Sequence, residues 1–364
     1  MKKKLNLLIT FFLCVMFSFS QTINELNFTN AQSLEIIGRA FDVTSGPYGR
    51  LPVDLQSEYR SGLWQMGACT AGVGVRFSSD ATVLGVKWTL TGNWTMDHMA
   101  ATGQHGVDLY VLHEGKWRYL GTGRPTGLSS SAVLIEEMDD VEREYLLYLP
   151  LYAGVTNLEI GCNQSATIST PKQNILRSQK VMGEKPIVMY GTSILQGGCA
   201  SRPGMAHTSI ISRALQTEVI NLGFSENAKC ETAMMKTLQR IDAKSYVLDF
   251  MPNMFINVTN DIFTDSVTAF IAGLAADKPN AKIYIVEHQN SPVAAVVTAH
   301  KSTNQMYNNL LFAIYNRLKG THANLVYIKS DGIIGLDGEG SVDGTHLTDL
   351  GYMRLAENLL KHLE

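Results

Sequence analysis

Two groups of polar residues in the C-terminal half have the types and spacing of a nucleophile and its activating base. Ser193 follows Gly191 and Thr192 at the end of a short apolar run, where a tight strand-to-loop turn exposes a hydroxyl to substrate. His346 lies three residues after Asp343, close enough for the carboxylate to accept the Nδ1 proton and fix the imidazole tautomer. Together these residues predict nucleophilic catalysis by an activated serine.

Hydrogen-bond donors for a developing oxyanion follow two other apolar runs. Asn253 comes directly after the run 245–250, and its amide can donate to an oxyanion. The segment Asn221-Leu-Gly223-Phe-Ser225-Glu226-Asn227 follows the run 218–222, and its backbone N–H groups can point the same way. An asparagine here can also simply form a turn.

The elements expected to position these residues alternate between strand and helix. Strands are predicted over 186–190, 218–222, 245–250, 281–286 and 324–328, and helices over 205–216, 232–241, 263–277, 302–319 and 347–363. Near-continuous apolar strands separated by helices indicate a parallel sheet that is covered on both faces. Sites in such sheets lie at the carboxyl ends of the strands, where the polar residues described above occur.

The N-terminal half has a different pattern, in which short β-rich runs alternate with Gly, Asn and Ser turns. Strands are predicted over 73–77, 83–88, 107–112, 144–149 and 157–161. This spacing is typical of an antiparallel, jelly-roll-like β-sandwich. The polar stretch 163–180 is the predicted linker, which gives an accessory domain with its linker over 21–180 and a second domain over 181–364.

Residues 1–20 have the pattern of a signal peptide. Lys2, Lys3 and Lys4 precede an apolar run over 5–17, and Ser18 and Ser20 are the small residues of a cleavage site. We therefore expect export to the periplasm, the cell surface or the medium, without stable membrane insertion.

Composition narrows the class of protein. The chain has 364 residues, of which 45% are hydrophobic and 17% charged, so it is globular rather than disordered. Its formal net charge of -3 argues against a nucleic-acid partner. Cys69, Cys162, Cys199 and Cys230 show no zinc-site spacing, so the sequence predicts no zinc site. The sequence leaves two states of these cysteines open: disulfides Cys69–Cys162 and Cys199–Cys230, or four buried free thiols.

Other polar and aromatic residues allow two interpretations. His207, Glu287 and His288 either line a substrate pocket or pack at the surface. Trp64, Trp88, Trp94 and Trp117 lie in the β-rich half, where they form sandwich core or a face on which sugars stack.

The order of serine, loop, asparagine and Asp-x-x-His resembles the SGNH hydrolase family, also called GDSL esterases. Residues 191–205 resemble the first family block, 221–225 the second, 251–253 the third and 343–346 the fifth. The segments 98–103 and 106–110 resemble the β-rich N-terminal module of one bacterial branch of the family.

The resemblance implies a flavodoxin-like three-layer domain and a serine esterase that needs no cofactor. Ser193 would be the nucleophile, His346 its base and Asp343 the residue that orients His346. The oxyanion hole would comprise the Ser193 N–H, the Asn253 side chain and one backbone N–H of the second block. The glycine that supplies this last donor in the family aligns with Glu226, so Glu226 and Gly223 are both candidates.

Family analogy and export together suggest O-acyl, most simply O-acetyl, esters on an oligosaccharide or polysaccharide. Two other functions remain open, namely a carbohydrate-binding protein with an inactive hydrolase half and a sugar acyltransferase.

The sequence departs from the family motif at the nucleophile. Residues 191–193 are Gly-Thr-Ser in place of the family's usual Gly-Asp-Ser, so a carboxylate beside the nucleophile is absent.

Overall fold

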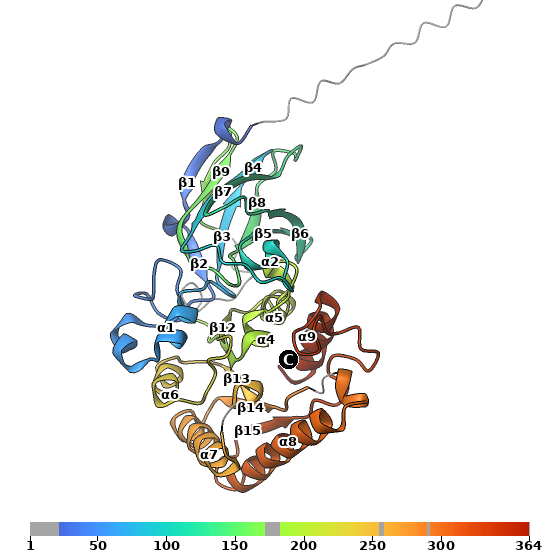
Figure 1. Ribbon diagram of the computed structural model, residues 1–364. Coiled ribbons are helices and arrows are strands. Elements are labelled where there is room, and N and C mark those ends of the chain that lie inside the picture. The colour runs from blue at the N-terminus through green and yellow to red at the C-terminus, as the bar shows by residue number, and fades with distance from the viewer. Residues whose placement is uncertain (1–21, 172–182, 255–257, 290–291, 364) are drawn as a thin grey trace, which may run out of the picture.

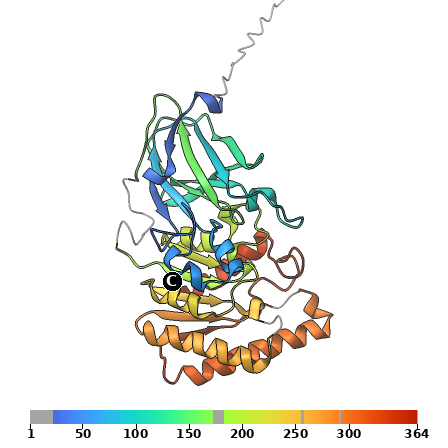
Figure 2. The ribbon, with the colours of Figure 1, turned by 60° about the vertical axis from the view of Figure 1, so that its left-hand side comes forward.

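The computed structural model describes residues 22–171, 183–254, 258–289 and 292–363 (Figure 1). The predicted signal peptide and most of the predicted linker lie outside these ranges. A β-rich module is followed by an α/β module whose carboxyl-terminal helix returns to its centre (Figures 1 and 2). No helix in the described ranges is both long and apolar enough to span a membrane.

The β-rich module is an antiparallel sandwich, as predicted. One sheet has the strand order β1-β9-β4-β7, and the other has the order β10-β3-β8-β5-β6 with β2 added to β3. The strands are β1 (Asn27–Asn30), β2 (Glu35–Ile37), β3 (Gly74–Ser79), β4 (Leu84–Leu90), β5 (Val107–His113), β6 (Lys116–Gly123), β7 (Ser129–Ile135), β8 (Arg143–Tyr148), β9 (Val155–Cys162) and β10 (Ile168–Ser169). Alternate residues such as Val86, Trp88 and Leu90 enter one core between the sheets.

The α/β module contains a five-stranded parallel sheet with the order β12-β11-β13-β14-β15. Its strands are β11 (Ile187–Gly191), β12 (Val219–Gly223), β13 (Ser245–Asp249), β14 (Lys282–Val286) and β15 (Leu325–Ile328). Alternate side chains enter separate cores, with Val188 and Tyr190 on one face of β11 and Ile187 and Met189 on the other. Helices therefore cover both faces of the sheet, as the continuous apolar strands predicted.

The helices form two layers around this sheet (Figure 2). One face is covered by α6 (Thr232–Gln239), α7 (Asn260–Asp277) and α8 (Thr298–Leu318). The other is covered by α4 (Ser193–Gln196), α5 (His207–Leu215) and α9 (Asp349–Leu363). Shorter helices are α1 (Ser61–Gly67), α2 (Ala101–Gln104) and the 3-10 turns η1 (Ile23–Glu25), η2 (Ala31–Ser33), η3 (Val53–Glu58), η4 (Pro203–Met205), η5 (Met251–Met254) and η6 (Pro292–Ala295).

Strand order brings three carboxyl ends together. Gly191 at the end of β11 is in register with Gly223 of β12 and with Asp249 of β13. The connection after β11 runs to β12 on one side, whereas the connection after β13 runs to β14 on the other side. The switch point at which open α/β sheets bind ligands therefore lies between β11 and β13. The segments that follow the three strands therefore lie side by side.

The last helix begins two residues later than predicted. The side chain of Thr348 accepts the N–H of Gly351 and caps a helix that starts at Asp349. His346 consequently lies three residues before α9 instead of directly before the helix. The two residues of the isolated bridge between Ser341 and Leu347 bracket the turn that contains His346.

A buried ion pair joins the two modules. Asp108 of β5 has a fully buried side chain, and its carboxylate accepts hydrogen bonds from Arg202 (2.5 Å) and from the Gly204 N–H (2.9 Å). Arg202 also donates to the Tyr110 hydroxyl (2.6 Å). The Gly-x-Asp-Leu-Tyr sequence at 106–110 thus holds the segment that follows α4.

All four cysteines of the described ranges are buried free thiols. This arrangement is one of the two alternatives that the sequence left open.

Candidate active site

Ser193 lies at a sharp turn between β11 and α4. Gly191 is required at this turn, because a Cβ there would lie 2.3 Å from the carbonyl oxygen of Asp249 on the neighbouring strand. Thr192 is the N-cap of α4, and its hydroxyl accepts the N–H of Ile194 (3.4 Å). The turn places the hydroxyl of Ser193, a residue with 9% of its surface exposed, at the carboxyl edge of the sheet.

A continuous hydrogen-bond chain links Ser193 to the turn before α9. The Ser193 Oγ lies 2.9 Å from Nε2 of His346, and Nδ1 of that ring lies 2.7 Å from Oδ2 of Asp343. With Nδ1 donating to the carboxylate, Nε2 is left as the acceptor for the serine proton. The geometry is that of a nucleophile, its base and the group that orients the base.

Backbone N–H groups hold the Asp343 carboxylate in place. Its Oδ1 accepts the N–H groups of Thr345 (2.9 Å) and His346 (2.7 Å). Partial burial raises the pKa of this carboxyl, but the hydrogen bonds from the His346 ring and from these two N–H groups outweigh it and lower the pKa to about 2. Asp343 is therefore ionised throughout the neutral range.

Asn253 lies in η5, directly beyond β13, and only 7% of its surface is exposed. Its Oδ1 accepts the N–H of Ala228 (3.2 Å), which fixes the amide against the second-block loop. No partner for its Nδ2 occurs among the described residues, so that donor is available to a ligand.

The two candidate backbone donors of the second block differ. The N–H of Gly223 donates to Oδ1 of Asn221 (2.8 Å), so Gly223 is not available as an oxyanion donor and that prediction needs correction. Gly223 has a packing role instead, because a Cβ there would lie 2.2 Å from the backbone nitrogen of Gln196. Glu226 is exposed, has a φ of 60°, and its N–H has no partner in the described ranges.

Arg50, which was not predicted from the sequence, holds the backbone of the second-block loop through hydrogen bonds to its carbonyl groups. It is 1% exposed, and its guanidinium donates to the carbonyls of Gly223 (2.7 Å), Asn221 (3.1 Å), Cys69 (2.7 Å) and Met66 (2.7 Å). Burial lowers its pKa to about 10, so it remains a cation at neutral pH. Nothing in the sequence around a single arginine in a loop indicates these contacts.

The β-rich module reaches the nucleophile through two aromatic residues. The buried Tyr152 donates from its hydroxyl to the carbonyl of Ser193 (3.3 Å), and burial raises its pKa well above the ordinary value. Trp94 packs edge-on against Tyr152, with ring centroids 6.2 Å apart, and keeps 50% of its surface exposed. An exposed indole therefore lies one side chain away from the nucleophile.

The prediction for His207 was wrong, whereas that for Trp88 was one of the two alternatives left open. His207 is fully buried, neither lining a pocket nor packing at the surface, and its ring stacks on Tyr352 with centroids 5.6 Å apart. Burial lowers its pKa to about 3, so the ring is neutral. Tyr352 in turn donates to the carbonyls of Ile194 and Gly198 and supports the nucleophile turn. Of the four tryptophans, Trp88 belongs to the sandwich core.

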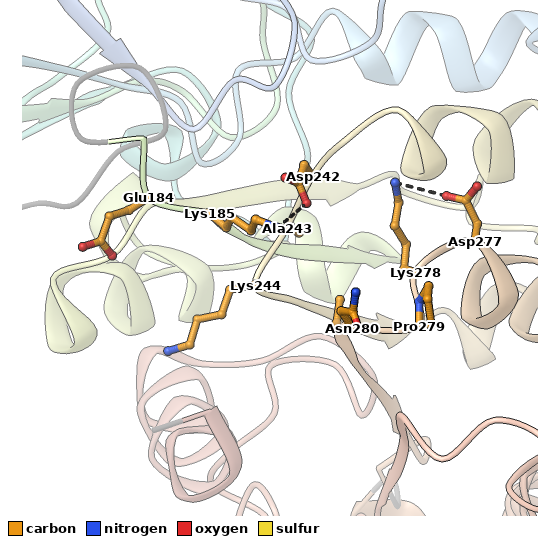
Figure 3. Close-up of a pocket in the computed structure, with 10 residues that line it drawn as sticks. Glu184, Lys185, Asp242, Ala243, Lys244, Asp277, Lys278, Pro279 and Asn280 are labelled. Atoms are coloured by element: carbon orange, nitrogen blue, oxygen red, sulfur yellow. Dashed lines mark ion pairs between the residues drawn. The ribbon is translucent and has the colours of Figure 1, made fainter.

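A cavity of about 500 Å³ lies at the opposite edge of the sheet (Figure 3). Its lining residues precede β11, β13 and β14, and they include the ion pairs Lys185–Asp242 (2.9 Å) and Lys278–Asp277 (3.1 Å). This charged cavity is remote from Ser193, which follows the carboxyl end of β11.

One group within the described residues has the side chains to hold a metal ion, namely His98, Cys199 and His346.

Both modules of the chain match known family models. Residues 184–364 match the model of the GDSL-like lipase/acylhydrolase family, and residues 26–168 match that of the N-terminus of SGNH-hydrolase-type esterases. The comparison with curated proteins found no match.

Solved structures extend the likeness over both modules. A protein of Bacteroides ovatus described as a GDSL-like lipase is 31% identical, with a TM-score of 0.85 over 92% of this chain and 96% of that one. A salicylyl-acyltransferase from a tetracycline biosynthetic pathway is 16% identical (TM-score 0.71, 93% and 96% covered). A family two carbohydrate esterase from Cellvibrio japonicus is 12% identical (TM-score 0.58, 93% and 97% covered), and at such identities the likeness shows the fold alone.

The Bacteroides relative matches nearly the full length of both chains. Together with the two family models, it assigns the chain to a family. The chain belongs to the GDSL-like lipase/acylhydrolase family of esterases and carries the N-terminal module of its SGNH-type members.

Proposed function

We propose that the protein is an exported serine esterase that removes O-acetyl or similar short O-acyl groups from carbohydrates. The observation that carries this proposal is the chain of hydrogen bonds from Ser193 through His346 to Asp343. The predicted signal peptide supports export, and the fold neighbours support a carbohydrate ester.

The reaction begins with the acyl-enzyme. Ser193 Oγ attacks the ester carbonyl carbon while Nε2 of His346 takes its proton over the 2.9 Å hydrogen bond. Asp343, ionised and held by two backbone N–H groups, stabilises the imidazolium that forms. The imidazolium then gives the proton to the leaving sugar oxygen. A water activated by His346 releases the acid and restores Ser193.

Negative charge develops on the carbonyl oxygen in each tetrahedral intermediate. The donors proposed for it are the N–H of Ser193, the N–H of Glu226 and Nδ2 of Asn253, none of which has a partner among the described residues. Preorganised donors of this kind supply much of the rate enhancement in acyl transfer. The Glu226 carboxylate is exposed and forms no ion pair in the described ranges, which agrees with a side chain turned to solvent.

Trp94 supports a sugar substrate. Its half-exposed indole contacts Tyr152, whose hydroxyl bonds to the backbone of Ser193, so a sugar stacked on Trp94 could present its ester to the nucleophile. One fold neighbour, a family two carbohydrate esterase from Clostridium thermocellum, was solved in complex with cellohexaose.

Released acetate from acetylated plant and host glycans tests the proposal. We expect release by the wild type and none by Ser193→Ala. Trp94→Ala should raise KM on the glycan and leave hydrolysis of p-nitrophenyl acetate unchanged, because the small ester needs no stacking surface. Absence of acetate release from every glycan, with p-nitrophenyl acetate still cleaved, would contradict the carbohydrate substrate but not the esterase.

Two other functions share parts of this site. The acyltransferase among the fold neighbours keeps open transfer to an acceptor alcohol, which would attack the same acyl-enzyme in place of water. Product analysis with and without an added sugar acceptor distinguishes transfer from hydrolysis. A binding protein with an inactive hydrolase half would leave p-nitrophenyl acetate uncleaved, and the hydrogen-bonded serine argues against it.

A further inference from the structure

Three side chains with metal-binding atoms meet beside Ser193. His98 comes from the β-rich module, Cys199 from the segment after α4 and His346 from the turn before α9, and one ligand atom of each lies within 4.8 Å of the other two. The rings of His98 and His346 have centroids 5.5 Å apart. Because the three residues are far apart in the sequence, spacing motifs cannot reveal the group.

Both histidines are arranged as metal ligands usually are. Nδ1 of His346 bonds to Asp343 (2.7 Å), and Nδ1 of His98 bonds to Asp97 (3.2 Å). A carboxylate on one ring nitrogen fixes the tautomer and orients the other nitrogen toward a cation, and most metal-binding histidines have such a partner. Nε2 is therefore the nitrogen of each ring that would face the cation, which in His346 would replace the Ser193 hydroxyl as the partner of Nε2.

Cys199 supplies the sulfur. It is buried, it is a free thiol, and it has a φ of 73°, a left-handed conformation that few residues other than glycine adopt. Neither the proposed reaction nor a disulfide uses this thiol.

Two imidazoles and a thiolate suit Zn²⁺, which binds nitrogen at about 2.0–2.1 Å and sulfur at about 2.3 Å in a tetrahedron. Ligand atoms of such an ion are roughly 3.5 Å apart, so these side chains would need to close by about 1 Å. A water would take the fourth position.

We propose that His98, Cys199 and His346 form a binding site for Zn²⁺ or a chemically similar cation that reversibly inhibits the enzyme. Binding displaces the thiol proton to solvent and occupies Nε2 of His346, so that nitrogen can no longer accept the proton of Ser193. The cation would also tie the β-rich module to the turn before α9. The inhibition rests on the proposed function, whereas the binding site does not.

Cobalt binding tests the site without reference to activity. The full mature chain, freed of metal, is titrated with Co²⁺ and followed by its absorption spectrum. We expect one ion per chain, with a thiolate-to-cobalt charge-transfer band that is absent in Cys199→Ser. Cys230→Ser is the matched control, because Cys230 is also buried with a positive φ but does not belong to the group. A spectrum without the thiolate band in the wild type would overturn the proposal.

Zinc inhibition of p-nitrophenyl acetate hydrolysis tests the consequence. Zn²⁺ should inhibit the wild type and the Cys230 variant, and EDTA should restore the rate. Cys199→Ser should keep the basal rate and need about 10–100-fold more Zn²⁺, since even the loss of a supporting residue costs that much affinity. Equal inhibition of Cys199→Ser would show that the ion binds without the thiol, and would overturn the site. A thiolate–cobalt band in a chain with no esterase activity would refute the proposed function and leave the site standing.

Discussion

Replacing Asn253 by aspartate separates the two roles of this side chain. In the structure Oδ1 accepts the N–H of Ala228, and Nδ2 is available for the oxyanion. Asn253→Asp keeps an acceptor for Ala228 and replaces the donor by an oxygen of nearly equal size. The backbone of the second block should therefore stay in place while the oxyanion loses a donor and gains a negative neighbour.

The expected loss has two parts. Removing one oxyanion donor costs about 10²–10³ in kcat, or about 3–4 kcal/mol. A carboxylate about 4 Å from the oxyanion adds roughly 4 kcal/mol at an effective dielectric constant of 20. Asn253→Ala should therefore lose about 10²–10³ in kcat, and Asn253→Asp about 10⁵–10⁶ once the new carboxyl is ionised.

The assay is hydrolysis of p-nitrophenyl acetate, with kcat and KM measured across pH. KM should change little, because the donor acts on charge that exists only in the transition state. The aspartate variant should fall further below the alanine variant as pH rises and the new carboxyl ionises. Asn227→Ala is the control, since that side chain bonds to the carbonyl of Ser225 in the same loop. A wild-type kcat in Asn253→Asp would refute the oxyanion role.

Three further substitutions test other parts of the account. Glu226→Gly should change kcat by less than about tenfold, because the exposed carboxylate takes no part and glycine suits the positive φ; a hundredfold rise would mean that the carboxylate impairs the oxyanion hole. Asp108→Asn should lower the free energy of unfolding by about 3 kcal/mol, which is the low end for a broken buried ion pair because Arg202 keeps 22% of its side chain exposed. An unchanged midpoint of denaturant unfolding would contradict this. Burial raises the pKa of Asp249 to about 7, so the native state keeps a proton that the unfolded chain releases near pH 4, and stability should fall as pH rises between these values. Asp249→Asn should remove that slope in melting temperature between about pH 4 and pH 7, and equal slopes in the two proteins would contradict the assignment.

Local pattern was enough to predict the parallel sheet and the turn before α9. Apolar strands such as β11 are continuous because both faces are buried, and their ends can be read from the sequence to within a residue. Asp343 and His346 are three residues apart, so their contact depends on a local turn. The meeting of Ser193 with His346 could be expected only from the order of family blocks.

Features that depend on long-range packing could not be predicted. The strand β7 begins with three serines and resembles a loop, yet it pairs with β4 throughout its length. Arg50 gains its partners only when the loop before α1 packs against β12. Gly223 was a candidate donor because Glu226 aligns with the glycine that supplies this donor in the family. Its N–H bonds to Asn221 instead, and close packing on α4 explains the glycine.

The most direct test of the central claim is to find the acyl group on Ser193. After rapid mixing with p-nitrophenyl acetate, the reaction is quenched with acid and the peptide that contains residue 193 is analysed by mass spectrometry. The Ser193–His346–Asp343 account predicts a burst of nitrophenol of at most one equivalent per chain, an acetyl group on Ser193, and loss of both in Ser193→Ala, whose kcat should fall about 10⁴-fold or more. Turnover by Ser193→Ala at the wild-type rate, or an acetyl group on another residue, would contradict it.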